Sequence, residues 1–112
     1  MATFQLNIVS TRGRIFAGDV ESLIVPGVEG DLGVLAGHAP MIALIRRGVG
    51  KVETGTETHH YVFGEGVLEV TKKDVVLLSD TADRVGTHAE ALAKAAELIK
   101  AAASEGKGWA TR

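Results

Sequence analysis

The stretch "VPGVEGDLGVLAGHAPMI", Val25 to Ile42, sets turn-forming residues between single apolar ones. Glycines stand at positions 27, 30, 33 and 37, between Pro26 and Pro40. This glycine density disfavours a helix, because glycine is among the weakest helix formers. The apolar content is too high for a linker. The stretch therefore predicts short strands joined by tight turns.

The chain on either side of this stretch, as far as about Thr81, has the same character. Phe4, Leu6 and Ile8 alternate with polar residues, a period-two pattern typical of a half-buried strand. Further short apolar runs follow, separated by glycine-containing turns. Eight to ten short strands at this spacing indicate a β-sandwich or a small barrel.

Three details of this strand pattern matter below. Gly18-Asp19 reads as a turn between two strands. The runs 42–45 and 49–53 read as one long strand, bent at Gly48 and Gly50. Residues 75–78 are apolar at every position, so we expect this strand to lie centrally in its sheet.

After the strands the composition changes to alanine, glutamate, lysine and leucine, which favours one helix. Thr87 and Glu90 fit a capping box, in which the hydroxyl and the carboxylate each accept a backbone N–H. Glu90 and Lys94 form an i,i+4 pair, and Gly106 and Gly108 end the helix. One face carries the apolar residues Leu92, Ala96, Ile99 and Ala103. The expected fold is mainly β with a C-terminal α segment: a sandwich domain, 1–82, then a helix and short tail, 83–112.

Composition excludes several classes of function. The 112 residues carry a formal net charge of −2, which does not suit nucleic-acid binding. There is no cysteine, so disulfides and thiolate metal sites are absent. The N-terminal sequence predicts no signal peptide. No apolar run approaches the 18 or so residues that a membrane-spanning helix needs.

The sequence offers no convincing catalytic or cofactor site. Histidines occur at 38, 59, 60 and 88, but His59 and His60 are adjacent and would point to opposite faces of a strand. A cupin-like barrel that binds a metal or small molecule stays as the alternative. No serine has a nucleophile-elbow context, and the glycine run lacks the Lys-Ser/Thr of a phosphate loop. We expect no enzymatic activity, no metal and no cofactor.

The glycine-rich stretch itself remains to be explained. A stiff, exposed loop bearing Glu29 and Asp31 on a β scaffold suits a docking surface. The residues alone are equally compatible with awkward turns between short strands.

The segment "VPGVEGDLGVLAGHAPMIALIRRGVGKV" closely resembles the epsilon subunit of F-type ATP synthases. The Glu-Gly-Asp-Leu-Gly string, Gly37-His38-Ala39-Pro40 and the following Gly48 stand in the family's order and spacing. "FQLNIVSTRGRIFAGDVESLIVPG" and "GEGVLEVTKKDVVLLSDTADR" resemble the family's first and last strands. The likeness covers about residues 3 to 100.

The resemblance implies a flattened sandwich of about ten strands, followed by a helical hairpin. It implies a non-catalytic subunit of the central stalk that couples rotation of the c-ring, through gamma, to ATP synthesis. The partners would be gamma, the c-ring and, through the helix, the alpha/beta head. The place would be the cytoplasmic face of a bacterial plasma membrane, with membrane contact only through the ring. The expected docking residues, at one lower end of the sandwich, are Glu29, Gly30, Asp31, Gly33, Gly37, His38, Ala39 and Pro40.

Beyond the sandwich the sequence departs from the family pattern. The second C-terminal helix, which brakes ATP hydrolysis in some members, is largely missing before Arg112, so we expect no braking by that route. The polar positions of an ATP-binding pattern in some members fall on Ala89 and Leu92, so we expect no ATP binding there. Trp109 would either anchor the tail or lie in a disordered tail.

Overall fold

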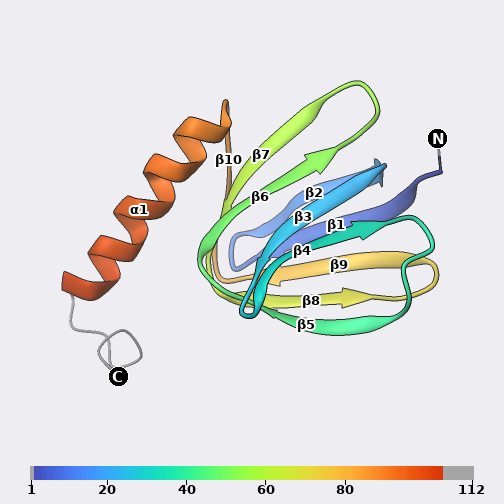
Figure 1. The fold of residues 1–112 in the computed structure, drawn as a ribbon, viewed down its shortest axis with the longest axis horizontal. Coiled ribbons are helices and arrows are strands. Elements are labelled where there is room, and N and C mark those ends of the chain that lie inside the picture. Colours follow the sequence, from blue (N-terminus) through green and yellow to red (C-terminus); the bar gives the residue numbers. More distant parts are fainter. Residues whose placement is uncertain (1, 105–112) are drawn as a thin grey trace.

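The computed structural model describes residues 2–104 of the chain, as ten strands followed by one helix (Figure 1). The last helix turns are described by their backbone alone from residue 101 onward. The elements are β1 (Phe4–Ser10), β2 (Gly13–Val20), β3 (Ser22–Gly27), β4 (Gly30–Leu35), β5 (Met41–Ile45), β6 (Gly48–Glu53), β7 (Thr58–Phe63), β8 (Gly66–Val70), β9 (Asp74–Ser79), β10 (Ala82–Val85) and α1 (His88–Ser104).

The strands form two layers that meet along one seam. One layer has the order β4-β3-β6-β7-β10 and the other β5-β8-β9-β1-β2. The two join where Gly27 of β3 pairs with Ile45 of β5. All neighbours are antiparallel except β1 and β9, which run parallel. The predicted mainly-β sandwich with one C-terminal helix is thus confirmed.

The core lies between the two layers and is almost wholly apolar. Its members come from the inward positions of the strands, as the period-two pattern of β1 predicted, with Leu6 and Ile8 fully buried. Tyr61 and Phe63 of β7 stack with ring centroids 5.5 Å apart. Burial raises the pKa of the Tyr61 hydroxyl. The alternation of β1, β7 and β9 therefore sets the core and leaves their other positions facing outward.

The strand boundaries differ from the expected ones at two places. β2 runs straight through Gly18 and Asp19, because these residues pair with β1 rather than turning. The expected long strand is two strands, β5 and β6, which belong to different layers. β5 pairs with β8, whereas β6 pairs with β7 and β3. The chain crosses between the layers at Arg46-Arg47, and this crossing is central to the site described below.

The last strand, β10, links the sandwich to the helix. Ala82–Val85 pairs with the edge of β7, with Ala82 opposite Phe63. This strand spans the boundary that the sequence analysis places between residues 82 and 83. The helix therefore leaves directly from a strand of the sandwich, which fixes the position where α1 begins.

The N-terminus of α1 has half of the predicted capping box. The backbone N–H of Glu90 donates to the Thr87 hydroxyl oxygen at 3.1 Å, as expected for an N-cap. The Glu90 carboxylate accepts from that same hydroxyl at 3.5 Å instead of from a backbone N–H. Likewise, Lys94 pairs with Asp83 of β10 at 3.7 Å, and not with Glu90 as predicted. The helix is thus tied to the last strand of the sandwich.

The helix uses a different face from the one predicted to make its contacts. Ala91 and Ala95 are buried against Val62 of β7, with Val49 and Val85 around them. The expected stripe is exposed instead: Leu92 by 51% and Ile99 by 48%, with Ala96 also exposed. Ala103 lies outside the residues whose side chains are described. Alanine lets the helix approach the sheet closely, which the bulkier stripe would prevent.

This packing generates a prediction about α1. Ala91→Glu places a carboxylate in the contact with Val62, which is costly without a partner. We expect amide exchange in α1 to accelerate at least about tenfold, while the sandwich keeps its protection. The matched variant Leu92→Glu lies on the exposed face, one residue away. Equal effects of the two substitutions on exchange in α1 would show that the helix packs through the other face.

Candidate docking site

The first part of the predicted site is the turn between β3 and β4. Glu29 and Asp31 are both exposed. Gly30 has φ +129°, a backbone conformation that residues with side chains rarely adopt. A Cβ on Gly27 would lie 2.6 Å from the carbonyl oxygen of Gly30, so the two arms of the turn need glycine there to close. The sequence thus permits a tight turn that carries its two acids outward.

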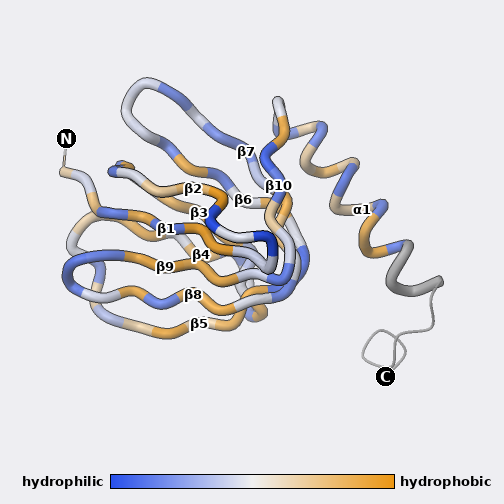
Figure 2. Tube along the Cα trace, turned by 180° about the vertical axis from the view of Figure 1, so that it is seen from behind, coloured by the Kyte–Doolittle hydropathy of each residue, from blue (hydrophilic) through white to orange (hydrophobic). Residues whose placement is uncertain are grey.

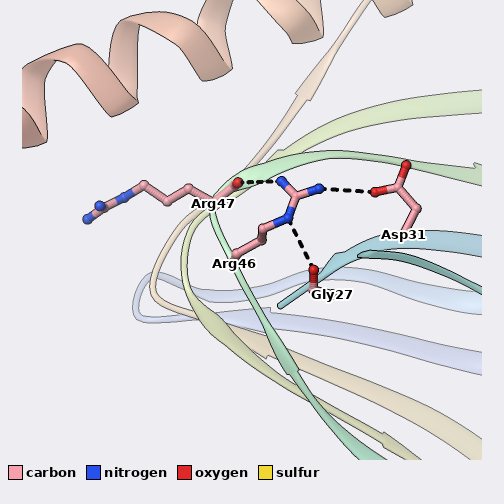
Figure 3. Close-up of polar contacts among 4 residues, drawn as sticks. All are labelled: Gly27, Asp31, Arg46 and Arg47. Atoms are coloured by element: carbon pink, nitrogen blue, oxygen red, sulfur yellow. Dashed lines mark hydrogen bonds and ion pairs between the residues drawn. The ribbon is translucent and has the colours of Figure 1, made fainter. Parts of the chain in front are cut away.

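Arg46, at the crossing between the layers, holds this turn in place (Figure 3). Its Nε donates to the carbonyl oxygen of Gly27 at 3.1 Å, and its Nη2 lies 3.3 Å from Oδ1 of Asp31. Nη1 donates to the carbonyl oxygen of Arg47 at 3.2 Å. The fork geometry of guanidinium suits this simultaneous bonding. The contacts join a turn and a crossing that lie 15 or more residues apart in the sequence.

The second part of the predicted site is the connection from β4 to β5. Gly37 has φ +81°. The backbone N–H of His38 donates to the carbonyl oxygen of Leu35 at 3.1 Å, which closes a turn. Nδ1 of His38 lies 2.7 Å from the carbonyl oxygen of Ala39, so this nitrogen carries the proton that is donated. His38 is therefore bound to its own loop, beside the exposed Pro40.

The two parts of the site lie at opposite ends of β4, and not together at one end as expected. Gly33 lies midway along this strand. The five residue steps from Gly30 to Leu35 span about 17 Å at roughly 3.3 Å each. The two turns can therefore contact different partners, or two places on one partner.

β5 runs back between the two turns and carries exposed apolar side chains. Ile42 is 71% exposed and Leu44 59% exposed. In the register of the layer, Leu44 lies opposite Val67 of β8, which lies opposite Leu78 of β9, itself 51% exposed. We call these four residues the outer patch. Figure 2 shows the hydrophobic segments of β5, β8 and β9 side by side.

The outer faces of the two layers thus differ in cover. On the β6–β7 layer, the outward residues Val49 and Val62 lie under α1. On the β5–β8–β9 layer, no element among residues 2–104 covers the outer patch, and Leu44 and Leu78 stay more than half exposed. An exposed apolar surface of this kind is typical of a protein-binding site.

A shallow groove of about 450 Å³ separates the β3–β4 turn from β5. Val28 and Glu29 line one side, and Met41, Ile42 and Leu44 line the other. Val28 itself is 54% exposed, and its backbone N–H donates to the carbonyl oxygen of Leu44 at 3.0 Å. The groove therefore makes the turn and the outer patch one continuous surface.

The alternative reading, a metal centre, finds no constellation in the described part of the chain. Nε2 of His59 lies 2.9 Å from Oε1 of Glu57. This hydrogen bond, together with the charge of His59, lowers the pKa of the Glu57 carboxyl. His60 points to the other face, toward His88, with ring centroids 6.0 Å apart. Nowhere in residues 2–104 do three His, Cys, Asp or Glu side chains converge as metal ligands would.

The sequence analysis missed the outer patch, although its signal was present. Residues 42–45 and 75–78 are apolar at every position, whereas a strand with one solvated face alternates. Such runs were read as a sign of central strands. β9 is indeed central, between β8 and β1, yet Leu78 on it is 51% exposed. An apolar outward face therefore indicated a missing partner layer. The structure thus defines a β-sandwich docking module with a preformed turn beside an apolar face.

Comparison with known proteins agrees with this class. Residues 3–85 match the family described as "ATP synthase, Delta/Epsilon chain, beta-sandwich domain". The ATP synthase epsilon chain of Helicobacter pylori (strain HPAG1) is 36% identical over 109 residues, which cover 94% of this chain and 89% of that one. ATP synthase epsilon chain 1 of Nitrobacter hamburgensis is 45% identical over 85 residues, 76% of this chain and 63% of that one.

Two solved structures share the fold. A chain in the Euglena gracilis mitochondrial ATP synthase structure, titled "OSCP/F1/c-ring in rotational state 1", has a TM-score of 0.73 at 28% identity. The match covers 90% of this chain and 66% of that one. A chain of the Tetrahymena thermophila "central stalk/cring" structure has a TM-score of 0.63 at 9% identity, covering 86% and 90%, which supports the fold alone.

The chain belongs to the ATP synthase delta/epsilon family. This family supplies a structural and regulatory subunit of the rotary complex, and not the catalytic one. Against the Nitrobacter relative the chain spans less than two thirds of the length. Ala89 and Leu92 are exposed at the start of α1, and the absence of ATP binding there stays a prediction. Trp109 lies outside the described residues.

The β4–β5 turn yields a prediction of its own. Gly37→Ala forces a side chain into a positive-φ conformation, so we expect a loss of about 1 kcal/mol in the free energy of unfolding. Gly37→Asn should cost clearly less, because asparagine tolerates this region better. Urea denaturation of the three proteins measures the difference. If alanine proved no worse than asparagine, the backbone at position 37 would not require glycine.

Proposed function

We propose that this chain couples the rotation of an ion-driven c-ring, through the gamma subunit, to ATP synthesis in the catalytic head. The observation that supports the proposal is the outer patch, an apolar face next to a rigid turn that the described chain leaves open. The titles of the two similar structures name a c-ring and a central stalk, which is where such a docking module would act.

In this proposal the two parts of the site have different partners. The outer patch and the loop of His38 and Pro40 pack against gamma, which offers apolar surface. The β3–β4 turn faces the loops of the c-ring. Helix α1, on the far layer, is left to contact the alpha/beta head. β5 connects the two docking regions, so a load on one is carried directly to the other.

The size of the outer patch shows why both contacts are needed. Burying a large apolar side chain completely is worth about 1.5–3 kcal/mol. Ile42, Leu44 and Leu78 are already partly covered, so the remaining gain is about 1–2 kcal/mol each. That sum of about 3–6 kcal/mol only reaches the lower part of the association cost of about 4–15 kcal/mol. A stable complex therefore also requires the turn.

The proposed place is the cytoplasmic face of a bacterial plasma membrane, to which the chain would bind peripherally through the ring. The bacterial relatives support this assignment. Among the described residues, no helix has the length and apolar character needed to traverse a bilayer.

A charge in the outer patch tests the proposal. Leu44→Asp should weaken binding to a complex of gamma with the c-ring from the same organism at least about 30-fold, as for a central interface residue. Stability should change little, because Leu44 is exposed. Binding is measured by biolayer interferometry, with folding checked by circular dichroism.

The matched control is Leu92→Asp on α1, a leucine of similar exposure on the other layer. It should bind like the unmodified chain. If both variants bound equally well, the outer patch would have no part in docking. If the unmodified chain failed to bind at micromolar concentration, the proposed function itself would be wrong.

A further inference from the structure

The β3–β4 turn is fastened to β5 by more than strand pairing. The backbone N–H of Arg46 donates to the carbonyl oxygen of Pro26 at 2.9 Å, and that of Val28 donates to Leu44 at 3.0 Å. Between these two bonds, the Arg46 guanidinium donates to Gly27 and pairs with Asp31. The turn is therefore held on its stem by backbone bonds and near its tip by one side chain.

Gly48 gives an independent sign that the Arg46 side chain belongs in this place. A Cβ at position 48 would lie 2.8 Å from Cβ of Pro26 and 2.9 Å from Nη1 of Arg46. The guanidinium and the proline thus occupy space that exists because residue 48 has no side chain. Such a built seat distinguishes Arg46 from a surface arginine that meets an acid by chance.

The two acids of the turn consequently have different surroundings. Asp31 is 66% exposed but shares its charge with Arg46. Glu29 is exposed, and within residues 2–104 the structure gives it no ion pair. Glu29 also lines the groove together with the apolar Val28. A partner therefore meets one unneutralised carboxylate next to an apolar side chain.

We propose that Arg46 is the positioning residue of the docking turn. It takes Asp31 out of the contact surface and presents Val28 and Glu29 to the partner. The occupant is a c-ring loop that carries a basic side chain, since its charge complements Glu29. This inference rests on the proposed function and revises the sequence-based view that Glu29 and Asp31 dock alike.

Three variants of the full-length chain separate these roles. Glu29→Gln removes the contact charge. Asp31→Asn keeps an oxygen that accepts from Arg46. The double variant Arg46→Gln/Asp31→Asn removes the clamp but leaves the net charge of the turn unchanged. Glu97→Gln, at an exposed position on α1, is the control for a lost acid elsewhere. Binding to the gamma–c-ring complex is measured between about 20 and 300 mM salt.

The expected results differ in kind as well as in size. Glu29→Gln binds roughly fivefold more weakly at low salt and loses part of the salt dependence, as expected for a rim charge. Asp31→Asn and Glu97→Gln bind within about twofold of the unmodified chain. The double variant also weakens binding roughly fivefold but keeps the full salt dependence. In the free protein, its amides at 28–33 exchange faster.

Other outcomes overturn the proposal. If Asp31→Asn weakened binding and salt dependence as much as Glu29→Gln, both acids would contact the partner. If the double variant bound normally, or its amides at 28–33 exchanged at the unmodified rate, Arg46 would position nothing. Failure of the unmodified chain to bind would overturn the proposed function as well, whereas the exchange of the free chain reports on the clamp alone.

Discussion

The structure depends on one constraint: both layers of the sandwich are apolar on their outer as well as their inner faces. A two-layer fold buries only the inner faces. The chain covers one outer face itself, by laying Ala91 and Ala95 of α1 onto Val62. The other outer face, with Leu44 and Leu78, is left for something beyond residues 2–104. The family to which the chain belongs works inside a large assembly, where such cover is at hand.

The crossing between the layers determines where this open face meets the rigid turn. Because β5 and β6 belong to different layers, the chain must pass from one to the other at Arg46-Arg47. That passage lies beside the end of β3, so Arg46 reaches Gly27 and Asp31. The acidic turn is therefore attached to the same strand that carries Ile42 and Leu44. A pull on the turn is transmitted to β5 without an intervening flexible loop.

Much of the fold could be predicted from the sequence, because it follows from local patterns. The alternation of Phe4, Leu6 and Ile8 and the N-cap at Thr87 each depend on neighbours in the chain. The layer crossing could not be predicted, since the apolar period is the same on both sides of Gly48. The contact face of α1 was wrong for a different reason. Leu92 and Ile99 are more hydrophobic than Ala91, but a small residue is what close packing on a sheet requires.

The candidate site was predicted in part. Glu29, Asp31 and the glycines do form exposed turns, yet the pairing of Asp31 with Arg46 joins residues far apart in sequence. No local pattern reveals such a pair. The most direct test of the account is an amide-exchange footprint of the full chain, alone and bound to its gamma–c-ring complex. The account predicts slower exchange in β5, β8 and β9 and in the β3–β4 turn on binding. Protection confined to α1, with the outer patch still exchanging freely, would contradict it.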